Sequence, residues 1–491
     1  MLPVADLIVL ATYLAAVVGL GLWLGRRRPD AEEYVAAGRS LPGWAIGLSM
    51  FGSYISSISF LANPGKAYES NWNAVAFTLA TPFAAALAVR WFVPFYRRRD
   101  EISAYEHLEQ RFGGWARTYA VVCFLLYQMA RMGSVVYLLA LAVARLAGWE
   151  VRTTIVLTGA LVTVYTLAGG IKAVVWVGVL QSAVLIAGTL VCLAAVVLQT
   201  PGGVPEILRV GAAHDKFNLG SFGSSLSEST FWVVFVYGLV MHLTNFGVDQ
   251  SYVQRYLTAR SDRDARGSVW ITALLYLPVA PIFFFIGTAL FVFYGAQLGT
   301  AVADLKADAV FPHFIATQLP WGLAGLVIAA IFAASMDSNL NSMATITLCD
   351  LYKPYLRPEA GERESLRVLY ASTLLWGVAG TGVGLAMTQV KTALDAWWNL
   401  AGLFSGGVLG LFLLALFCPR ARRLAGAIAV TTSVMVMTWM ALPSLDRFDI
   451  PSSLRNPLHA NLTIVVGTLT IFAVGLLVSW LKPAAAPALE N

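Results

Sequence analysis

The feature that most constrains this chain is a long series of apolar segments, each long enough to cross the hydrocarbon core of a bilayer as a helix. Such a helix needs about 20 mostly apolar residues. Of the 491 residues, 58% are hydrophobic and only 12% are charged, which is too apolar for a soluble domain. Thirteen segments of this kind occur, at residues 4–25, 43–61, 73–95, 118–146, 153–168, 173–199, 231–249, 270–293, 319–348, 368–387, 394–417, 426–442 and 462–481. The sequence therefore predicts an all-α polytopic membrane protein.

Basic residues occupy every second loop between these segments, which is typical of loops on the cytoplasmic side of a membrane. The basic groups are arginines 26–28, arginines 97–99, Arg260 with Arg263 and Arg266, Lys353 with Arg357 and Arg363, and Arg420 with Arg422 and Arg423. They predict a multi-pass protein of a bacterial-type inner (plasma) membrane, with its N-terminus outside and its C-terminus in the cytoplasm. The net charge of +6 follows from this topology, so nucleic acid is not an expected partner. Because the first segment lacks a basic start and a cleavage site, we interpret it as a retained helix.

Motifs of enzymes are missing from the sequence. The four cysteines, at positions 123, 192, 349 and 418, do not have the spacing of metal ligands. The chain also has no glycine-rich phosphate loop, zinc-type histidine pair or nucleophile elbow. The sequence thus predicts neither an enzyme nor an ATP-driven pump.

The second apolar segment carries an unusual density of hydroxyl groups. Serines 49, 53, 56, 57 and 59 lie within eleven residues, together with Gly52, and Pro64-Gly65 follows them. Membrane transporters often bind at interrupted helices, because freed carbonyls coordinate a cation while half-helix ends face the solute. Serines in membrane helices can also bond their own backbone or pack between helices. We interpret the density here as a binding site.

Two charged residues lie deep inside apolar segments. Asp337 stands in the run of small and polar residues at 334–342, where a carboxylate is costly unless it is paired or hydrated. It therefore needs a cation, a proton or an arginine, and a structural ion pair is the alternative to a functional role. Arg131 stands too far inside its segment to reach either surface easily. Its planar guanidinium suits the carboxylate of a solute, and an internal salt bridge, for example with Asp337, is the alternative.

Taken together, these motifs resemble those of the sodium:solute symporter family, most closely its bacterial sialic acid transporter branch. The resemblance extends over nearly the whole chain. The residues that carry it most clearly are 34–67, 103–112, 169–176 with Gln181, 249–256 and 340–352.

This resemblance implies a single transporter domain over residues 1–491. Its center is a leucine-transporter-type core of two inverted five-helix repeats (5+5) at 42–417. An extra N-terminal helix and loop occupy 1–41, two peripheral helices 418–482, and a short cytoplasmic tail 483–491. The first helix of each repeat is expected to be broken, near residues 49–61 and 241–249.

The resemblance also implies roles for individual residues. Solute contacts fall on Tyr54, Ser56, Ser59, Thr78 and Arg131. The arginine is the residue expected in the sialic acid branch, whereas Tyr54 and Thr78 replace a threonine and a glutamine.

The main sodium site of the family falls on the carbonyls of Gly52 and Ile55 and on the eighth core helix, with Ala334, Asp337 and Ser338 as candidates. That helix is shorter here by about three residues, which rotates its later residues by about 60° around the helix axis. Its usual pair of hydroxyl ligands is therefore in question.

A second departure is Gly178, which stands where sodium-binding relatives often have an aspartate. A second sodium site is for this reason not expected. We hypothesise that Asp337 returns the missing charge from the facing helix. One Na⁺ would then have only oxygen ligands, as hard cations prefer.

The sequence thus predicts a secondary active transporter that couples Na⁺ to the uptake of a small solute by alternating access. The solute is expected to be a sialic acid-like sugar acid, another carboxylate or a sugar, and no obligatory protein partner is evident. A proton-coupled or uncoupled carrier of the same fold is the alternative. A transporter-like solute sensor is a further alternative, disfavoured by the short expected tail.

Overall fold

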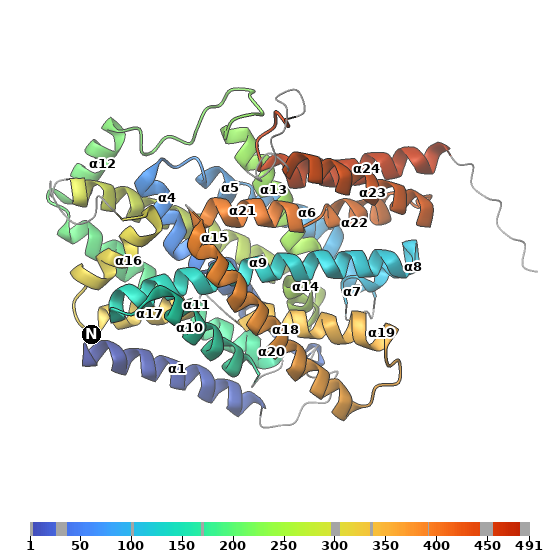
Figure 1. Ribbon diagram of the computed structural model, residues 1–491, viewed down its shortest axis with the longest axis horizontal. Coiled ribbons are helices and arrows are strands. Elements are labelled where there is room, and N and C mark those ends of the chain that lie inside the picture. The colour runs from blue at the N-terminus through green and yellow to red at the C-terminus, as the bar shows by residue number, and fades with distance from the viewer. Residues whose placement is uncertain are drawn as a thin grey trace, which may run out of the picture.

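The computed structural model describes residues 3–25, 37–99, 103–167, 171–295, 305–333, 337–390, 392–441 and 455–481. Within these ranges the chain is helical, and an isolated β-bridge joins Leu41 to Ala259. Figure 1 shows the helices running roughly along one common direction, as expected of a bundle that crosses a bilayer. The predicted all-α fold is confirmed.

The described residues contain eight helical segments that are long and apolar enough to cross a membrane. They are Val4–Gly21, Val75–Arg97, Gly114–Ala144, Ile171–Gln199, Asp262–Gly295, Glu362–Gln389, Arg423–Ala441 and Leu462–Leu481. Three bent helix pairs raise the number to as many as eleven. Two shorter apolar helices, α10 (Val151–Thr166) and α17 (Leu323–Ala333), lie where the remaining predicted segments begin.

The two helix breaks that the resemblance implies, near residues 49–61 and 241–249, both occur, and each is short. Helix α3 (Gly43–Tyr54) ends before a π-helical turn, η2 (Ile58–Ala62), that leads into α4 (Asn63–Glu69), and the two halves are bent by 53°. Helix α13 (Phe231–Gly247) ends directly before α14 (Gln250–Leu257), with a bend of 47°. These breaks confirm the expectation that the first helix of each repeat is discontinuous.

A third interruption was not predicted. The predicted segment 394–417 consists of α21 (Ala393–Phe404) and α22 (Val408–Phe417), bent by 44°. Gly406 and Gly407 lie between them with φ of +59° and +67°, a conformation that side chains with a Cβ rarely adopt. The run Ser405-Gly406-Gly407 inside the segment was the available signal for this break.

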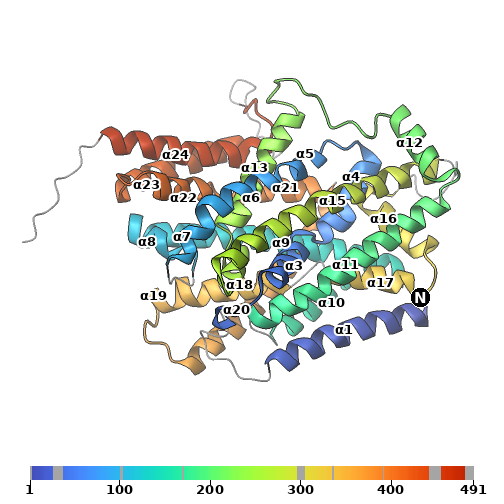
Figure 2. The same cartoon turned by 180° about the vertical axis from the view of Figure 1, so that it is seen from behind.

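Helix α3 lies between two long helices, α11 (Ile171–Gln199) and α15 (Asp262–Gly295) (Figure 2). The approach to α11 depends on glycine, because a Cβ added at Gly178 would lie 2.5 Å from the hydroxyl of Ser49. On the α15 side, Thr272 donates a hydrogen bond to the carbonyl of Gly47. The interrupted helix is thus held on two sides near its break.

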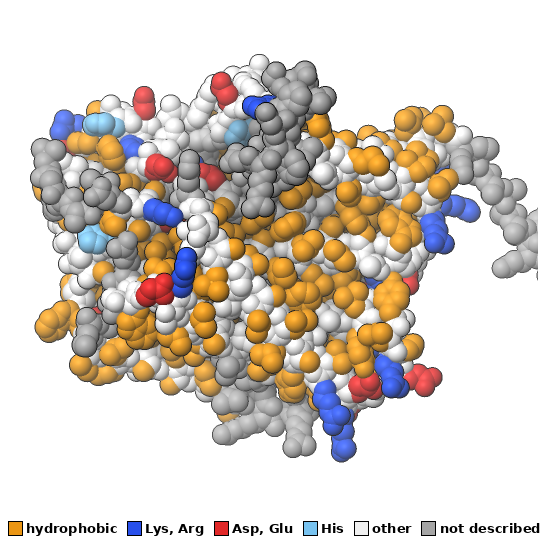
Figure 3. Space-filling model, viewed as in Figure 1, with side chains coloured by type: hydrophobic (Ala, Val, Ile, Leu, Met, Phe, Trp, Pro, Cys, Tyr) orange, Lys and Arg blue, Asp and Glu red, His pale blue; other side chains and the backbone are white. Residues whose placement is uncertain are grey.

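The expected additional helices lie at the edges of the bundle (Figure 1). Helix α1 (Val4–Gly25) packs on α17 and α11, and α23 (Arg423–Ala441) pairs with α24 (Leu462–Leu481) at the opposite edge. Hydrophobic side chains dominate the middle of the face in Figure 3, and charged side chains gather toward its left and right ends. This distribution fits a protein whose middle is surrounded by lipid.

Candidate functional site

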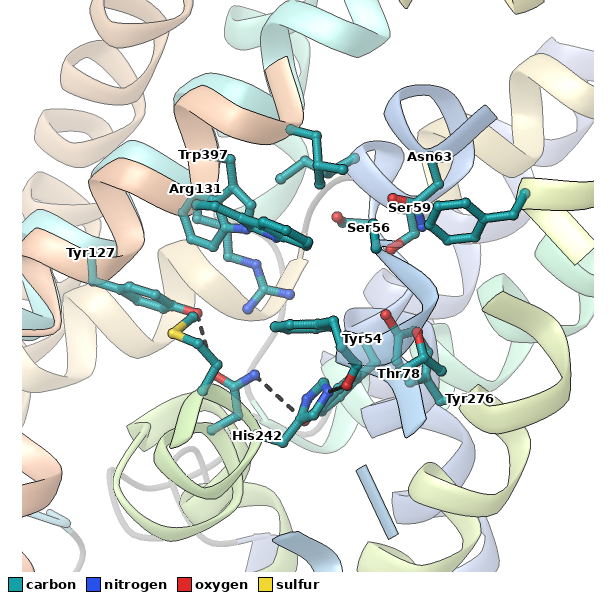
Figure 4. A pocket seen from close by; sticks show the side chains of 18 of the residues that line it. Tyr54, Ser56, Ser59, Asn63, Thr78, Tyr127, Arg131, His242, Tyr276 and Trp397 are labelled. Carbon is teal, nitrogen blue, oxygen red and sulfur yellow. Dashed lines mark hydrogen bonds between the residues drawn. The ribbon is translucent and has the colours of Figure 1, made fainter. Parts of the chain in front are cut away.

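A cavity lies beside the break after α3, and all five residues predicted to contact solute line it (Figure 4). Its walls come from α3, η2 and α4, α5 (Val75–Leu79), α9 (Gly114–Ala147), α13 and α14, α15 and α21. Its polar and aromatic lining residues include Tyr54, Ser56, Ser59, Asn63, Thr78, Tyr127, Arg131, His242, Asn245, Tyr252, Tyr276, Trp397 and Trp398. The structure therefore brings the predicted residues together, and their part in binding stays a prediction.

Arg131 extends from α9 toward this cavity (Figure 4) and is only 7% exposed. Its guanidinium donates to the carbonyl of Ser53, one residue before the end of α3, and to the hydroxyl of Tyr252 at 3.4 Å. Among the described side chains, no carboxylate lies within the 4.0 Å of a salt bridge to it. A buried charge with only neutral partners is costly, so the site is suited to an anionic ligand.

Four of the five serines near the break divide into two groups by the direction of their hydroxyls. Ser56 and Ser59 line the cavity, whereas Ser57 donates its hydroxyl to the carbonyl of Val135 on α9 at 3.1 Å. Ser49 packs against Gly178 on α11, away from the cavity. Hydroxyl density therefore marked the correct segment, but part of it supports helix packing.

Tyr54 and His242 join the two broken helices. The Tyr54 hydroxyl lies 2.8 Å from Nδ1 of His242, and Nε2 of the same ring lies 3.0 Å from the carbonyl of Phe77. A carbonyl can only accept, so Nε2 carries the proton and Nδ1 accepts from Tyr54. Asn245 in turn donates to the Tyr54 oxygen at 3.5 Å, and Tyr127 donates to the Asn245 side-chain oxygen at 3.2 Å. The donor and the acceptor of each of these four hydrogen bonds are thereby assigned.

The sequence alone did not identify several polar and aromatic residues of the cavity. They are Asn63, Tyr127, His242, Asn245, Tyr252, Tyr276, Trp397 and Trp398. His242 and Asn245 are three residues apart and share one face of α13, just before its predicted break. That spacing was the available signal. The aromatic residues gave no comparable signal, because such residues are common in apolar helices.

Only part of the predicted sodium site lies within the described residues. Helix α3 ends at Tyr54, and Ile55 leaves helical geometry with φ −88° and ψ 85°. A helix leaves its last four carbonyls without partners in the helix, so carbonyls from Gly52 onward suit a hard cation. Helix α17 ends at Ala333 and α18 (Asp337–Ile346) follows. Ala334 lies outside the described residues, as do the side chains of Asp337 and Ser338.

The structure gives a steric reason for the glycine at position 178. Any side chain there would meet Ser49, whose Oγ lies 2.5 Å and whose Cα lies 3.1 Å from an added Cβ. Gly52 is equally close to α11, since its added Cβ would lie 2.5 Å from Ser182 Oγ. An aspartate cannot be accommodated at 178 while α3 and α11 remain this close.

Three motif residues, Ser103, Glu109 and Asp350, form a polar network with Arg117 outside the lining of the cavity. Asp350 is fully buried and pairs with Arg117 at 2.5 Å, and it also accepts a hydrogen bond from Ser103 at 2.7 Å. Arg117 also pairs with Glu109 at 2.6 Å. The network ties the start of α9 to the turn after α18. These motif residues therefore have a structural role that is separate from the cavity.

Sequence comparison identifies relatives over most of the chain. Residues 34–432 match the profile of the sodium:solute symporter family. The sodium/sialic acid symporter SiaT of Proteus mirabilis is 32% identical over 87% of this chain and 88% of its own length. The sodium/sialic acid symporter NanT of Aliivibrio fischeri is 32% identical over 96% and 92%. The human sodium/iodide cotransporter is 29% identical over 88% and 69%.

Structural comparison agrees. A substrate-bound, outward-open Na⁺-coupled sialic acid symporter matches with a TM-score of 0.88 and 29% identity, covering 98% of both chains. Mhp1, a nucleobase-cation-symport-1 family transporter, matches with a TM-score of 0.59 over 92% of this chain and 96% of its own. Its 16% identity supports the fold alone. The expected core of two five-helix repeats is thereby confirmed.

Proposed function

Because this chain belongs to the sodium:solute symporter family, we propose that the solute it carries is a sialic acid-like sugar acid. The chain is a Na⁺-coupled secondary transporter of a multi-pass membrane family. The observation that carries the choice of solute is Arg131, a buried guanidinium that faces the cavity with neutral partners only. The two relatives that are 32% identical are both sodium/sialic acid symporters, which supports the same choice.

A sugar acid matches the polarity of the whole cavity. Its carboxylate would accept two parallel hydrogen bonds from the guanidinium of Arg131, the geometry in which arginine binds carboxylates most strongly. Its hydroxyl groups would meet Ser56, Ser59 and Thr78, which line the same cavity. Trp397 gives the sugar ring an apolar surface (Figure 4). A solute without a carboxylate would leave the arginine charge unpaired.

We propose that Na⁺ binds next to this solute. Its ligands would be the carbonyls of Gly52, Ile55 and Ala334 together with the side chains of Asp337 and Ser338. The carbonyl of Ser53 already accepts from Arg131, so the same helix end would serve the ion and the solute. A cation that orders this break also orders the solute site. By reciprocal linkage, the solute must then tighten Na⁺ binding by the same factor.

We also propose the orientation and the domain boundaries. The arginine-rich loops would face the cytoplasm of a bacterial-type inner membrane, with the N-terminus outside. Residues 42–417 would form the transporting core, and residues 1–41 and 418–482 would support it. The transport cycle requires no covalent bond to be formed or broken, so we expect no enzymatic activity. We also expect no obligatory protein partner.

Uptake into proteoliposomes tests the choice of solute. Labelled N-acetylneuraminate should accumulate when an inward Na⁺ gradient is imposed and should equilibrate without one. Unlabelled sialic acid should compete, whereas its carboxamide, which has the same shape without the charge, should not. Equal competition by the carboxamide would contradict a site built for an acid. Accumulation of another carboxylate but not of sialic acid would keep the role of Arg131 and reject the proposed solute.

A further inference from the structure

A second concave site lies at the arginine-rich end of the molecule, on the outer surface of the bundle. It is a groove of about 720 Å³ between the second core span, the start of α15 and the end of α22. The second core span comprises α6 (Thr81–Leu87), the π-helical turn η3 (Ala88–Phe92) and α7 (Val93–Arg97). Figure 2 shows α6 and α7 beside α15 on the face turned toward the viewer.

Four arginines line this groove, namely Arg90, Arg98, Arg99 and Arg266. The described residues that line it include no acidic side chain. The two carboxylates at the start of α15 are engaged elsewhere, since Asp262 pairs with Arg97 and Asp264 with Arg260, both at 2.9 Å. The positive charge of the groove is therefore not balanced by the described side chains around it.

Two neutral groups lie beside Arg99 in the groove. Arg99 lies 2.7 Å from Nδ1 of His107 and over the ring of Phe95, with 4.8 Å to the ring centroid. Burial and the nearby Arg99 and Arg111 lower the pKa of His107 to about 4. His107 is therefore neutral near pH 7 and can accept a hydrogen bond from Arg99.

Arg90 is the most informative of the four. It is exposed and lies within the membrane-spanning segment Val75–Arg97, eight residues before Arg98 and so about 12 Å farther along the helix. No carboxylate of the described residues lies within 4.0 Å of it, of Arg98 or of Arg266. A charge at this depth is costly unless an anion or water meets it. Its long side chain can extend toward the level of the lipid headgroups, where a phosphate can bind it.

The side chains beside the groove are charged, aromatic and aliphatic in the same order as the parts of a phospholipid. Along α15, Arg266, Trp270 and Leu274 succeed one another at intervals of four residues and so share one face. Arg266 lies at the end of the helix, Trp270 lines the groove, and Leu274 is 56% exposed farther into the bilayer. Tryptophan is typical of the level between headgroup and hydrocarbon. This order of charge, aromatic ring and aliphatic chain matches phosphate, glycerol ester and acyl chain.

We propose that the groove binds an anionic glycerophospholipid of the leaflet on the arginine-rich side, with its phosphodiester between Arg90, Arg98 and Arg266. Basic pockets between membrane helices on the cytoplasmic side commonly hold anionic headgroups. These three arginines favour an anionic lipid over a zwitterionic one, whose ammonium group they repel. The bound lipid links the second core span, α15 and α22, all of which contribute side chains to the groove.

Lipid retention by the purified full-length protein tests this site, and neither Na⁺ nor solute is needed for the measurement. The delipidated protein in neutral detergent is mixed with dioleoylphosphatidylglycerol, dioleoylphosphatidylcholine or glycerol 3-phosphate. Bound lipid is then counted by native mass spectrometry, and Tm is measured. We expect phosphatidylglycerol to be retained and to raise Tm, and the other two compounds to do neither. An equal Tm shift with glycerol 3-phosphate would overturn the proposal, because the site would then bind a free phosphate.

The matched variants compare arginines inside and outside the groove. The groove variant is Arg90→Gln/Arg98→Gln/Arg266→Gln, and the control is Arg263→Gln/Arg357→Gln/Arg367→Gln, which removes three exposed arginines that do not line it. The groove variant should lose more than half of the retained phosphatidylglycerol and of its Tm shift, and the control should keep both. Equal retention by the two variants would overturn the proposal.

A single variant covers the case in which the triple variant does not fold. Arg266→Gln changes one exposed side chain at the end of a helix. It should lower retention of phosphatidylglycerol relative to Arg263→Gln on the same helix, with equal Tm of the lipid-free proteins. Retention unchanged from the Arg263→Gln protein would overturn the proposal in the same way.

Discussion

The hydroxyl of Tyr54 donates a hydrogen bond of 2.8 Å to Nδ1 of His242, and this bond connects the two interrupted helices across the solute cavity. Tyr54 is the last residue of α3, and His242 lies in α13 shortly before its break. Because Nε2–H of His242 donates a hydrogen bond to the carbonyl of Phe77, the ring is neutral with Nδ1 unprotonated. Nδ1 can therefore only accept the hydrogen bond from Tyr54. The two interrupted helices are therefore joined through the Tyr54 hydroxyl at the point where the solute would bind.

The first prediction concerns this contact. Tyr54→Phe leaves a buried nitrogen of His242 without a donor, so we expect a loss of roughly 1 to 3 kcal/mol in the free energy of unfolding. Solute affinity should fall as well, because Asn245 loses the oxygen to which it donates. Thermal unfolding and titration calorimetry measure the two effects. Tyr370→Phe, at a 47% exposed position on α20 (Glu362–Ala386), is the matched control. An unfolding curve identical to that of the control would show that the hydrogen bond contributes nothing.

The second prediction separates the charge of Arg131 from its shape. Arg131→Gln should raise the Kd of a sugar acid by about tenfold to about 150-fold, because a hydrogen bond to a charged group contributes roughly 1.5 to 3 kcal/mol. Arg131→Lys keeps the charge but loses the planar fork, so its Kd should lie in between. The uncharged carboxamide should bind all three proteins with similar, weak affinity. If the two variants bind the acid as well as the unchanged protein, Arg131 is a structural residue.

The sequence predicted most of the fold because long apolar segments identify membrane helices by their composition alone. Helices lie within each predicted apolar segment, the serine-rich run around Gly52 predicted one break, and the family resemblance implied the break at 241–249. The break at Gly406 was missed because the run Ser405-Gly406-Gly407 is short and lies within a segment whose overall composition suits a continuous membrane helix. Composition records which residues face lipid but not where a backbone bends inside an apolar run.

The site was predictable where a residue type is costly at membrane depth. Arg131 stood out for this reason, and the structure places it at the cavity. Ser49 and Ser57 share the hydroxyl pattern of Ser56, yet they serve helix packing and a carbonyl of α9. What separates these roles is the direction in which each serine side chain points, toward the cavity or toward a neighbouring helix. His242 was missed because its partner Tyr54 lies 188 residues away in the sequence.

The third prediction tests the proposed ion site. Asp337→Asn removes a negative charge while keeping the size of the side chain, so the Na⁺ concentration for half-maximal uptake should rise several-fold while expression changes little. Uptake measured over a series of Na⁺ concentrations provides the comparison. Ser338→Ala should have a smaller effect in the same direction, because it removes a neutral ligand. Full sodium stimulation in Asp337→Asn would reject the hypothesis that this carboxylate returns the missing charge.

The fourth prediction rests on the contact between α3 and α11. Gly178→Asp should not add a second sodium site, since its Cβ would lie 2.5 Å from Ser49 Oγ. It should instead lower Tm and leave the Hill coefficient for Na⁺ unchanged. Gly178→Ala should also lower Tm, and adding Ser49→Ala should restore part of the loss by removing the hydroxyl that it meets. A rise in the Hill coefficient with Gly178→Asp would show that the helices can separate to form the second site.

The last prediction concerns the extra N-terminal helix, which contributes to the core through one side chain. Asp6 on α1 is 2% exposed, and its Oδ1 accepts hydrogen bonds of 2.7 Å from the backbone N–H groups of Gly322 and Gly325 at the start of α17. These donors have no partner within their own helix. Loss of such a cap costs typically about 1 kcal/mol, so Asp6→Ala should lower the free energy of unfolding by that amount, and Asp6→Asn by less.

The same cap has a consequence for ion coupling. The opposite end of α17 leads toward the residues proposed to bind Na⁺, so a loosened start of this short helix should also weaken Na⁺ binding. Thr12→Ala on the exposed face of α1 is the control, because its hydroxyl bonds only within its own helix. Unfolding and Na⁺ titrations of Asp6→Ala, Asp6→Asn and Thr12→Ala should rank in that order of severity. If Asp6→Ala unfolds earlier but binds Na⁺ normally, α1 supports the fold alone and has no part in coupling.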